Sequence, residues 1–200
     1  MQTIDTVLDY WFGDQSDLGL ISDEQAGLWW GKSEQADDDI RQQFGALLNE
    51  ISTGGLQDWR ESPRGMMALV ICTDQFPRNI FRDTPKAFSF DSVALGLART
   101  MLERNWHLEL RSIERVFLYL PFEHSEDLAD QNLAVALFRE LLESAGSEKE
   151  KNIMDGFLDF AIKHQVIIER FGRFPHRNAI LGRQSTQEEI EFLTQPGSSF

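Results

Sequence analysis

The sequence predicts an all-α protein built from antiparallel helix pairs, with eight or nine helices. Apolar residues recur at the 3.6-residue spacing of helices along most of the chain, and no stretch alternates convincingly at the period of two expected for a strand. Prolines, glycines and capping residues divide this pattern into segments joined by short loops. No change of composition divides the chain, so one helical domain covering residues 1–200 is expected.

The N-terminal quarter contains three expected helices. The first, Thr3–Phe12, carries one apolar face and is followed by a glycine, and residues 14–20 are expected to form a loop. A second helix starts near Asp23. Ser33 can cap a third, whose apolar stripe ends at Gly54. These boundaries follow from residues that start or stop helices.

Prolines mark the ends of the expected helices in the middle of the chain. Pro63 suits the first turn of a helix, and Pro77 is expected to end or kink that helix because proline has no backbone donor. Asp91 can cap the next helix. Ser112 then begins a short helix that Pro121 is expected to stop.

Three further helices are expected in the C-terminal part. Ser125 can cap the first of them, with two acidic residues in its first turn. The longest helix covers about 147–171, and Gly172 suits a left-handed C-terminal cap. Either Ser185 or Thr186, each with a glutamate three residues later, forms a capping box for a last short helix.

The composition restricts the class of protein. The chain has 19 Lys+Arg against 33 Asp+Glu, a net charge of -14, which argues against a nucleic-acid partner. One cysteine cannot form an internal disulfide, the longest apolar run is too short to cross a membrane, and no signal peptide is visible. We expect a soluble cytoplasmic protein, with no membrane partner and no cofactor, since phosphate-loop and nucleophile-elbow motifs are absent. The oligomeric state is left open.

An internal echo is the most specific pattern of the chain. The residues at 74–80 (DQFPRNI) recur in part at 172–180 (GRFPHRNAI), each with Phe-Pro followed by Arg and Asn. Arginine offers a planar five-donor fork that suits carboxylate or phosphate. Two such helix breaks that face each other would form a polar pocket. The alternative is structural, with an anchoring Phe, a helix-stopping Pro and an Arg paired to a neighbouring acid.

A second group of polar residues follows Pro121. His124 lies among three acidic residues at 123, 126 and 127, an arrangement that suits a general acid–base pair or a metal site. The alternative is an ordinary helix start, with Ser125 as the cap and the acids near the positive end of the dipole. The spacing matches no metal motif, so no metal ligand is assigned.

Two features near the C-terminus also allow alternatives. His164 lies within the apolar stripe of the long helix, which suits a hydrogen-bonded core histidine or, if it faces a polar pocket, proton transfer. Between Lys163 and Arg183 the chain carries five basic residues and one acid, Glu169. This basic island could hold an anion or could pair with the acidic surface of the protein itself.

Four blocks of sequence resemble a mostly bacterial family catalogued as domain of unknown function 924. They are Val7–Gly13 (VLDYWFG), Asp74–Phe81 (DQFPRNIF), Tyr119–Gln131 (YLPFEHSEDLADQ) and Arg170–Arg183 (RFGRFPHRNAILGR). The resemblance implies a tetratricopeptide-like right-handed stack of helix pairs, and no activity, substrate or cofactor. The motif positions of the family fall on Asp74, Gln75, Arg78, Asn79, His124, Glu126, Asp127, Arg173, His176, Arg177 and Asn178.

From these observations we predict one concave polar pocket for a small anionic molecule or an acidic peptide end. Arg78, His124 and Arg177 should then lie within about 15 Å of one another, close enough for joint contact with a small ligand. The expected ligand-binding residues are Asp74, Gln75, Arg78, Asn79, His164, Arg173, Arg177 and Asn178. The expected proton-handling residues, if the ligand reacts, are His124, Glu126, Asp127 and His176. The alternatives are a scaffold that packs a partner helix or peptide into a groove and, with less support, a metal-dependent hydrolase.

Overall fold

The computed structural model of the chain describes residues 2–13 and 21–199. The loop predicted for residues 14–20 lies outside the described residues. No strand occurs within the described ranges, so the all-α prediction is confirmed. The α-helical segments are α1 (Ile4–Phe12), α2 (Asp23–Trp30), α3 (Glu34–Ser52), α4 (Pro63–Val70), α5 (Phe76–Ile80), α6 (Asp91–Glu103), α7 (Ser112–Glu123), α8 (Leu128–Glu143), α9 (Glu148–Phe171) and α10 (Gln187–Leu193).

Short segments of other helix types connect these elements. A π-helical turn, η2 (Ile71–Gln75), joins α4 directly to α5, so that α4, η2 and α5 form one continuous helix. Counted in this way, the described part of the chain contains nine helices, as the sequence predicts. The 3-10 helices are η1 (Gln57–Glu61), η3 (Pro85–Phe88), η4 (Trp106–Glu109) and η5 (Pro175–Arg177).

Most predicted helix ends agree with the structure. The Thr3 side chain accepts a hydrogen bond from Thr6 N, and Ser33 caps α3 in the same way. Gly172 ends α9 with a φ of 66°, a left-handed value that glycine adopts without steric cost. Of the two possible capping boxes before α10, the structure contains the one made by Thr186 and Glu189.

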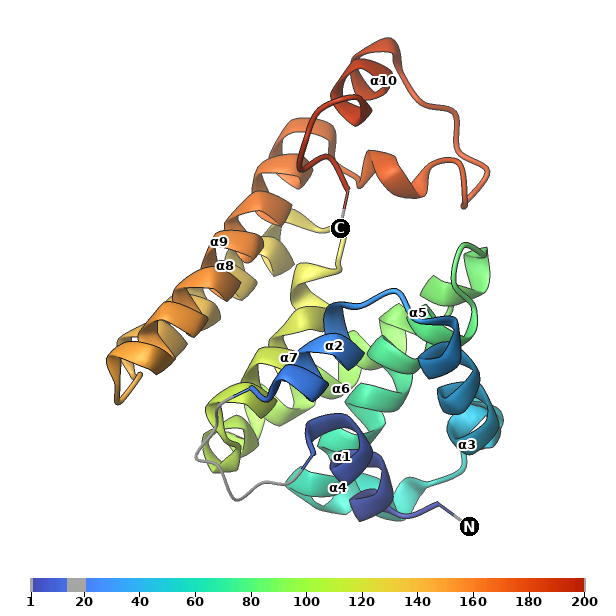
Figure 1. The fold of residues 1–200 in the computed structure, drawn as a ribbon, viewed down its shortest axis with the longest axis vertical. Coiled ribbons are helices and arrows are strands. Elements are labelled where there is room, and N and C mark those ends of the chain that lie inside the picture. Colours follow the sequence, from blue (N-terminus) through green and yellow to red (C-terminus); the bar gives the residue numbers. More distant parts are fainter. Residues whose placement is uncertain (1, 14–20, 200) are drawn as a thin grey trace.

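The helices pack around one extended apolar core. This core runs from α1 to α9 and includes the stacked aromatic rings of Phe44 and Phe76, whose centroids lie 4.8 Å apart. In Figure 1 the helices α1 to α7 form the lower body, and α8 and α9 form a long hairpin beside it. The tetratricopeptide-like stacking implied by the family resemblance stays a prediction.

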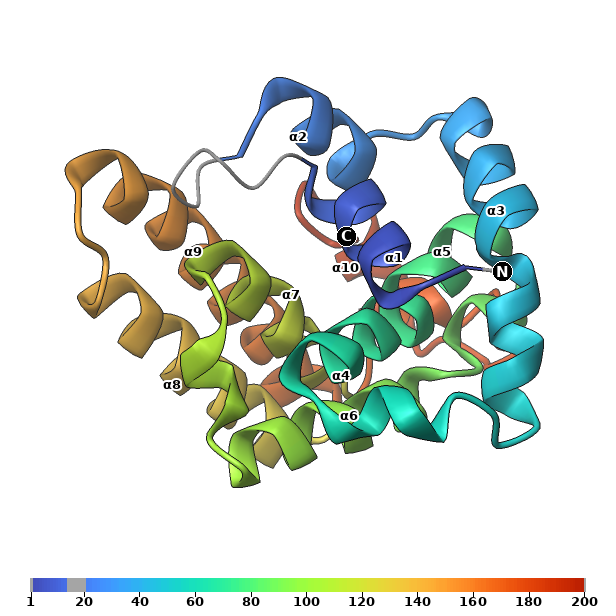
Figure 2. The same cartoon turned by 90° about the horizontal axis from the view of Figure 1, so that it is seen from below.

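A second, smaller apolar cluster lies at the end of α9. It consists of Ile167, Ile168 and Phe174, with Phe171 and Phe192 packed against them. Figure 1 shows the chain after α9 crossing to the side of α5 before it returns to α10, and Figure 2 shows α10 behind α1. The segment after α9 therefore carries its own apolar contacts, and it is this segment that bears the second copy of the Phe-Pro motif.

Candidate functional site

The π-helical turn positions the first polar group of the site. In this turn Phe76 N bonds to Ile71 O, five residues back, instead of the usual four. The prediction that the helix ends or kinks at Pro77 is wrong as to the end, because the helix continues to Ile80. A wide turn just before a proline changes the local pairing, and the missing proline donor is tolerated there. The Asp74 side chain is fully buried on this turn.

The turn between α7 and α8 positions the second polar group of the site, His124. The prediction that Pro121 stops α7 is wrong, since the helix continues to Glu123 and His124 N bonds to Leu120 O at 2.8 Å. Buried Gln131, from α8, donates hydrogen bonds to the backbone oxygens of Glu123 and Ser125, both at 2.6 Å. These bonds hold the turn in a shape that directs the His124 ring toward Asp74.

The cap of α8 also differs from the prediction. Asp127 caps the helix by accepting from Ala129 N at 2.7 Å, whereas Ser125 lies before the helix and donates to Asp130. Glu126 is consequently outside the helix. Its carboxylate accepts a hydrogen bond from Phe174 N at 2.8 Å, which attaches the segment after α9 to this turn.

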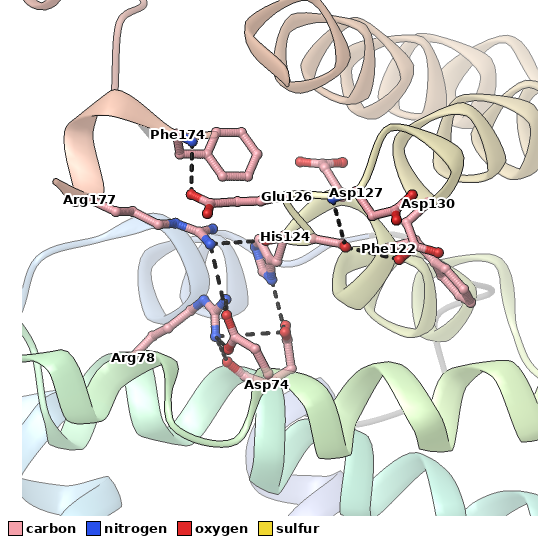
Figure 3. Close-up of polar contacts among 12 residues, drawn as sticks. Asp74, Arg78, Phe122, His124, Glu126, Asp127, Asp130, Phe174 and Arg177 are labelled. Carbon is pink, nitrogen blue, oxygen red and sulfur yellow. Dashed lines mark hydrogen bonds and ion pairs between the residues drawn. The ribbon is translucent and has the colours of Figure 1, made fainter. Parts of the chain in front are cut away.

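Five side chains meet where these elements converge, and we call them the Asp74 cluster: Asp74, Arg78, Asp91, His124 and Arg177. His124 Nδ1 lies 2.8 Å from Asp74 Oδ1. Arg78 donates to the Asp74 backbone oxygen at 2.7 Å and to both carboxylate oxygens of Asp91, at 2.9 and 3.2 Å. Arg177 reaches the cluster from the opposite side, as Figure 3 shows, and its Nη1 donates to His124 O at 2.9 Å. Arg78, His124 and Arg177 therefore lie close together, as the sequence predicts.

Arg177 differs from the other charged members of the cluster. Only 7% of the residue is exposed, and its closest carboxylate oxygen among the described ion pairs, Asp91 Oδ2, lies 3.9 Å away. Its Nε atom is shielded from solvent and has no hydrogen-bond partner. The guanidinium carbon lies over the rings of Phe174 and Phe88, 4.4 and 4.9 Å from their centroids. A buried charge is thus held by aromatic rings and one backbone oxygen.

The protonation of the Asp74–His124 pair follows from its surroundings. Burial alone would raise the pKa of Asp74, but the charges of His124 and Arg78 and the hydrogen bonds from His124 and Gln75 lower it to about 2. Burial and the charge of Arg78 lower the pKa of His124, although Asp74 opposes this. We therefore assign a carboxylate and a neutral imidazole at neutral pH. Because a carboxylate only accepts, Nδ1 carries the proton and Nε2 is the basic nitrogen.

A second carboxyl–imidazole pair lies beside the first. Glu123 Oε1 is 3.1 Å from His164 Nδ1, and both side chains are almost fully buried. The same nitrogen lies 2.9 Å from Phe160 O. Burial, reinforced by the charge of Asp74, raises the pKa of Glu123 to about 8, and burial lowers the pKa of His164 to about 3. At neutral pH this pair is an uncharged acid next to an uncharged base. His164 is thus a core histidine that also faces the site.

The basic island pairs largely with the protein's own acids. We call the largest connected group the Glu126–Glu189 network; it consists of Glu126, Arg173, Asn178, Arg183 and Glu189. Arg183 forms two hydrogen bonds to the Glu126 carboxylate, at 2.6 and 2.9 Å, and one to Asn178. Arg173 forms two to Glu189, at 2.6 and 2.8 Å. Arg173 and Asn178, both predicted to bind ligand, are therefore engaged in this network.

The remaining predicted residues fall into different surroundings. Gln75 donates to Asp74 Oδ2 at 2.5 Å and so supports the cluster. Asn79 turns away from it and donates to Asp37 on α3, which also binds Arg82. The ring of His176 lies 5.6 Å from that of Phe174, in the segment that carries Arg177. The two copies of the motif thus bring their arginines together and direct their asparagines elsewhere.

Comparisons with known proteins agree with the four sequence blocks. The family described as "Bacterial protein of unknown function (DUF924)" matches residues 7–197. The chain belongs to this family. A solved structure, that of the protein of unknown function ATU0120 from Agrobacterium tumefaciens, is similar with 33% sequence identity and a TM-score of 0.79, over 95% of this chain and 96% of that one. No curated protein matches.

Three residues of this site are not predicted by the sequence, and a fourth, Glu123, is predicted only as one of the acids around His124. Asp91 is predicted to cap a helix, whereas it is the first residue of α6 and pairs with Arg78. Gln131 is named only as the last residue of a family block. Phe88 has no distinguishing neighbour. For Glu123 and Gln131 the one signal is their place in the Tyr119–Gln131 block, which carries the family resemblance. The pairing of Arg78 with Asp91 had none.

Two cavities were found away from the cluster. One of about 770 Å³ lies between α1, α2 and α3 and is lined in part by Tyr10 and Trp29. The other, of about 420 Å³, lies beside Pro63 and Leu110. Within the described ranges, no three His, Cys, Asp or Glu residues are arranged to hold a metal ion, and no helix is both long and apolar enough to span a membrane.

Proposed function

We propose that the protein binds a small anionic ligand at the Asp74 cluster, with Arg177 as the main contact. The observation that carries the proposal is the buried Arg177 guanidinium, which has no carboxylate within hydrogen-bonding distance and a solvent-shielded Nε without a partner. Buried polar groups in native proteins are nearly always hydrogen-bonded, and an unpaired buried charge is costly. A ligand with acceptor oxygens would supply the missing partner.

Access requires the segment over the cluster to move. Phe174 and Arg177 both lie on the chain after α9, whose apolar contacts are with the end of α9 and with α10. Its attachment to the α7–α8 turn is polar and runs through Glu126 and the backbone oxygen of His124. We infer that this segment opens to admit the ligand and closes over it, since breaking such contacts leaves the main core intact.

The cluster also has the groups for acid–base chemistry on the bound ligand. Asp74 holds His124 in the tautomer with Nε2 as the base, the arrangement that carboxylate–histidine pairs use in general base catalysis. Glu123 is a neutral carboxylic acid nearby and could return a proton. In this proposal Glu126 positions the covering segment, Asp127 caps α8, and His164 and His176 complete the uncharged surroundings of the ligand.

The scaffold alternative is less well supported. It predicts an exposed apolar groove without buried charge. The large exposed apolar side chains of the described residues are distributed over several elements: Trp30, Leu108, Leu128, Phe160, Ile162, Val166, Leu181 and Ile190. Buried charge, on the other hand, is present in the Asp74 cluster. We therefore favour a small molecule or peptide end as the partner, in the cytoplasm, and not nucleic acid.

A thermal-shift screen against anionic metabolites, with native mass spectrometry for a retained ligand, tests the proposal. We expect at least one anion to raise the melting temperature of the wild type, and this shift to disappear in Arg177→Ala. Arg170→Ala is the matched control, because Arg170 lies on the same part of the chain but is half exposed in a pair with Glu188. The proposal fails if no anion stabilises the wild type or if Arg177→Ala keeps the shift.

A further inference from the structure

The surroundings of Arg177 also specify the class of ligand. Resting on the proposed function, we propose that the ligand presents a carboxylate with a single negative charge to Arg177 and carries an apolar group beside it. Three features support this inference: the unused hydrogen-bonding edge of the guanidinium, the charge balance of the cluster, and the aromatic rings around Arg177.

The unused edge suits a planar acceptor. Arg177 donates from Nη1 to the backbone oxygen of His124, and its Nε has no partner. The contacts with Phe88 and Phe174 are made by the guanidinium over the rings and satisfy no N–H group. A guanidinium and a carboxylate are both planar, and the two oxygens can accept parallel hydrogen bonds from Nε and a neighbouring nitrogen. The geometry of the unused edge therefore fits a carboxylate.

The charge balance of the cluster disfavours a ligand with more than one negative charge. Arg78 is already committed to both oxygens of Asp91 and lies 3.7 Å from Asp74 Oδ1. Arg177 is the cation of the cluster whose carboxylate partner, Asp91 Oδ2 at 3.9 Å, lies beyond hydrogen-bonding distance. With His124 neutral, the charges of Arg78 and Arg177 balance those of Asp74 and Asp91. One negative charge on the ligand can bind Arg177 directly, whereas a second would face Asp74 and Asp91 with no further cation nearby.

The other titratable groups around Arg177 add no positive charge. His124, His164 and His176 all have lowered pKa values, and burial is the largest cause for each. Burial raises the pKa of Glu123, so this group is also neutral. The remaining acid, Glu126, is paired with Arg183. A dianion such as phosphate would therefore add two negative charges to a cluster that is already neutral.

The aromatic rings account for the apolar group. Phe174 is fully buried and belongs to the small apolar cluster at the end of α9. A ligand whose carboxylate reaches Nε of Arg177 lies beside this ring and that of Phe88. Apolar surface placed there is removed from water, which favours binding. The same chemistry belongs to a free carboxylic acid and to the C-terminal carboxylate of a peptide.

Titrations at constant ionic strength test the inference, since surface screening by anions is then equal for all probes. The carboxylate probes are butyrate, benzoate and an acetylated Ala-Phe dipeptide with a free C-terminus; the comparison probes are the amidated dipeptide, phosphate and sulfate. We expect wild-type protein at pH 7 to bind at least one carboxylate at least about tenfold more tightly than phosphate or sulfate. Binding of the free dipeptide but not its amide would identify a peptide end, and binding of benzoate or butyrate alone a small acid.

Two variants, together with the probes, distinguish the proposed anion site from the inference that its ligand is a carboxylate. Arg177→Lys keeps the charge but loses the planar fork, so we expect at least about tenfold weaker carboxylate binding. Arg170→Lys should bind as the wild type does. If phosphate or sulfate binds in an Arg177-dependent manner and no carboxylate does, the carboxylate inference is wrong and the anion site stands. If no probe binds the wild type, both fail. The comparison of carboxylate with phosphate and sulfate binding uses only the wild-type protein. It therefore tests the carboxylate inference even if Arg177→Lys does not fold.

Discussion

Two groups of charged residues meet at the segment after α9, and they differ in how completely their charges are paired. In the Glu126–Glu189 network each arginine faces a carboxylate with two hydrogen bonds. In the Asp74 cluster, four residues along the chain from Arg173, Arg177 has no such carboxylate. The sequence makes these arginines look alike. Arg173 and Arg183 are paired with carboxylates and stabilise the fold, whereas Arg177 is available to a ligand.

The largest effect is expected from the buried acid of the Asp74 cluster. Asp74→Asn removes the charge that Arg78 and His124 face, and breaking a buried charged network in this way should lower the free energy of unfolding by about 3 kcal/mol. Denaturant unfolding at pH 7 measures it. Asp159→Asn is the control, because Asp159 forms an exposed pair with Lys163 and should change stability by less than about 0.5 kcal/mol. Equal effects of the two substitutions would contradict a buried ionised Asp74.

The second effect is a dependence of stability on pH. The pKa of Glu123 is raised to about 8 in the folded protein, so the unfolded chain releases this proton first as the pH rises. Its contribution is complete below the unfolded pKa and is lost between about pH 5 and pH 8, with a slope of up to about 1.4 kcal/mol per pH unit. His124, His164 and His176, whose pKa values are lowered, give a slope of the opposite sign below about pH 6.5. The Glu123 slope is therefore measured as the difference between the wild-type and Glu123→Gln unfolding profiles across this range.

The exposed Glu143→Gln, at the end of α8, serves as the control and should keep the wild-type slope. The contribution of Asp74 to stability changes with pH in the opposite direction. Its lowered pKa of about 2 means that its contribution is complete above its unfolded pKa and is lost as the pH falls through about 2. If the wild-type and Glu123→Gln profiles run parallel from about pH 5 to pH 8, Glu123 is not held as a neutral acid.

A smaller effect is expected where the two groups are joined. Glu126→Gln weakens the bonds to Arg183 and Phe174 N, which should lower local stability by about 1 kcal/mol. Hydrogen exchange of the amides from 172 to 183 measures this, and the Phe174 amide should show the change directly. Glu188→Gln, in an exposed pair with Arg170, should leave these amides as in the wild type. Unchanged exchange in Glu126→Gln would mean that apolar contacts alone hold the segment.

The smallest effect on stability is expected at the proposed ligand contact itself. Arg177→Met keeps the apolar stem and removes a buried charge without a close carboxylate, so stability should change by less than about 1 kcal/mol, in either direction. Arg173→Met should lower the melting temperature, because it leaves the buried Glu189 carboxylate without its arginine. Thermal unfolding of the two variants compares them. A larger loss for Arg177→Met would assign Arg177 to the fold and not to a ligand.

The predicted site was partly recoverable from the motifs. Arg78 and Arg177 were found because both copies of the Phe-Pro pattern carry arginine, and His124 because acids surround it. The patterns could not show that Asn79 bonds to Asp37 or that Asn178 joins the network with Glu189. A motif fixes which side chains are near a helix break, whereas their direction depends on the elements packed against them.

The helix does not end at Pro77 or at Pro121, and the two outcomes have a common physical origin. Proline removes one backbone donor, and the sequence rule concludes that a helix stops. Around Pro77 a π-helical turn precedes the proline, and at Pro121 the helix continues for one short stretch to Glu123. Buried packing of the surrounding side chains, including Phe76 and Phe122, keeps both segments helical. Tertiary packing therefore outweighed the local preference.

The sequence by itself determined the all-α fold, most helix boundaries and the family, because apolar periodicity, capping residues and motif blocks act over a few neighbouring positions. Only the tertiary structure decided which charges are neutralised. Asp91 pairs with Arg78 and Glu189 with Arg173, whereas Arg177 is left between two aromatic rings. Such pairing joins residues that are distant along the chain, and burial then sets how strongly each charge matters.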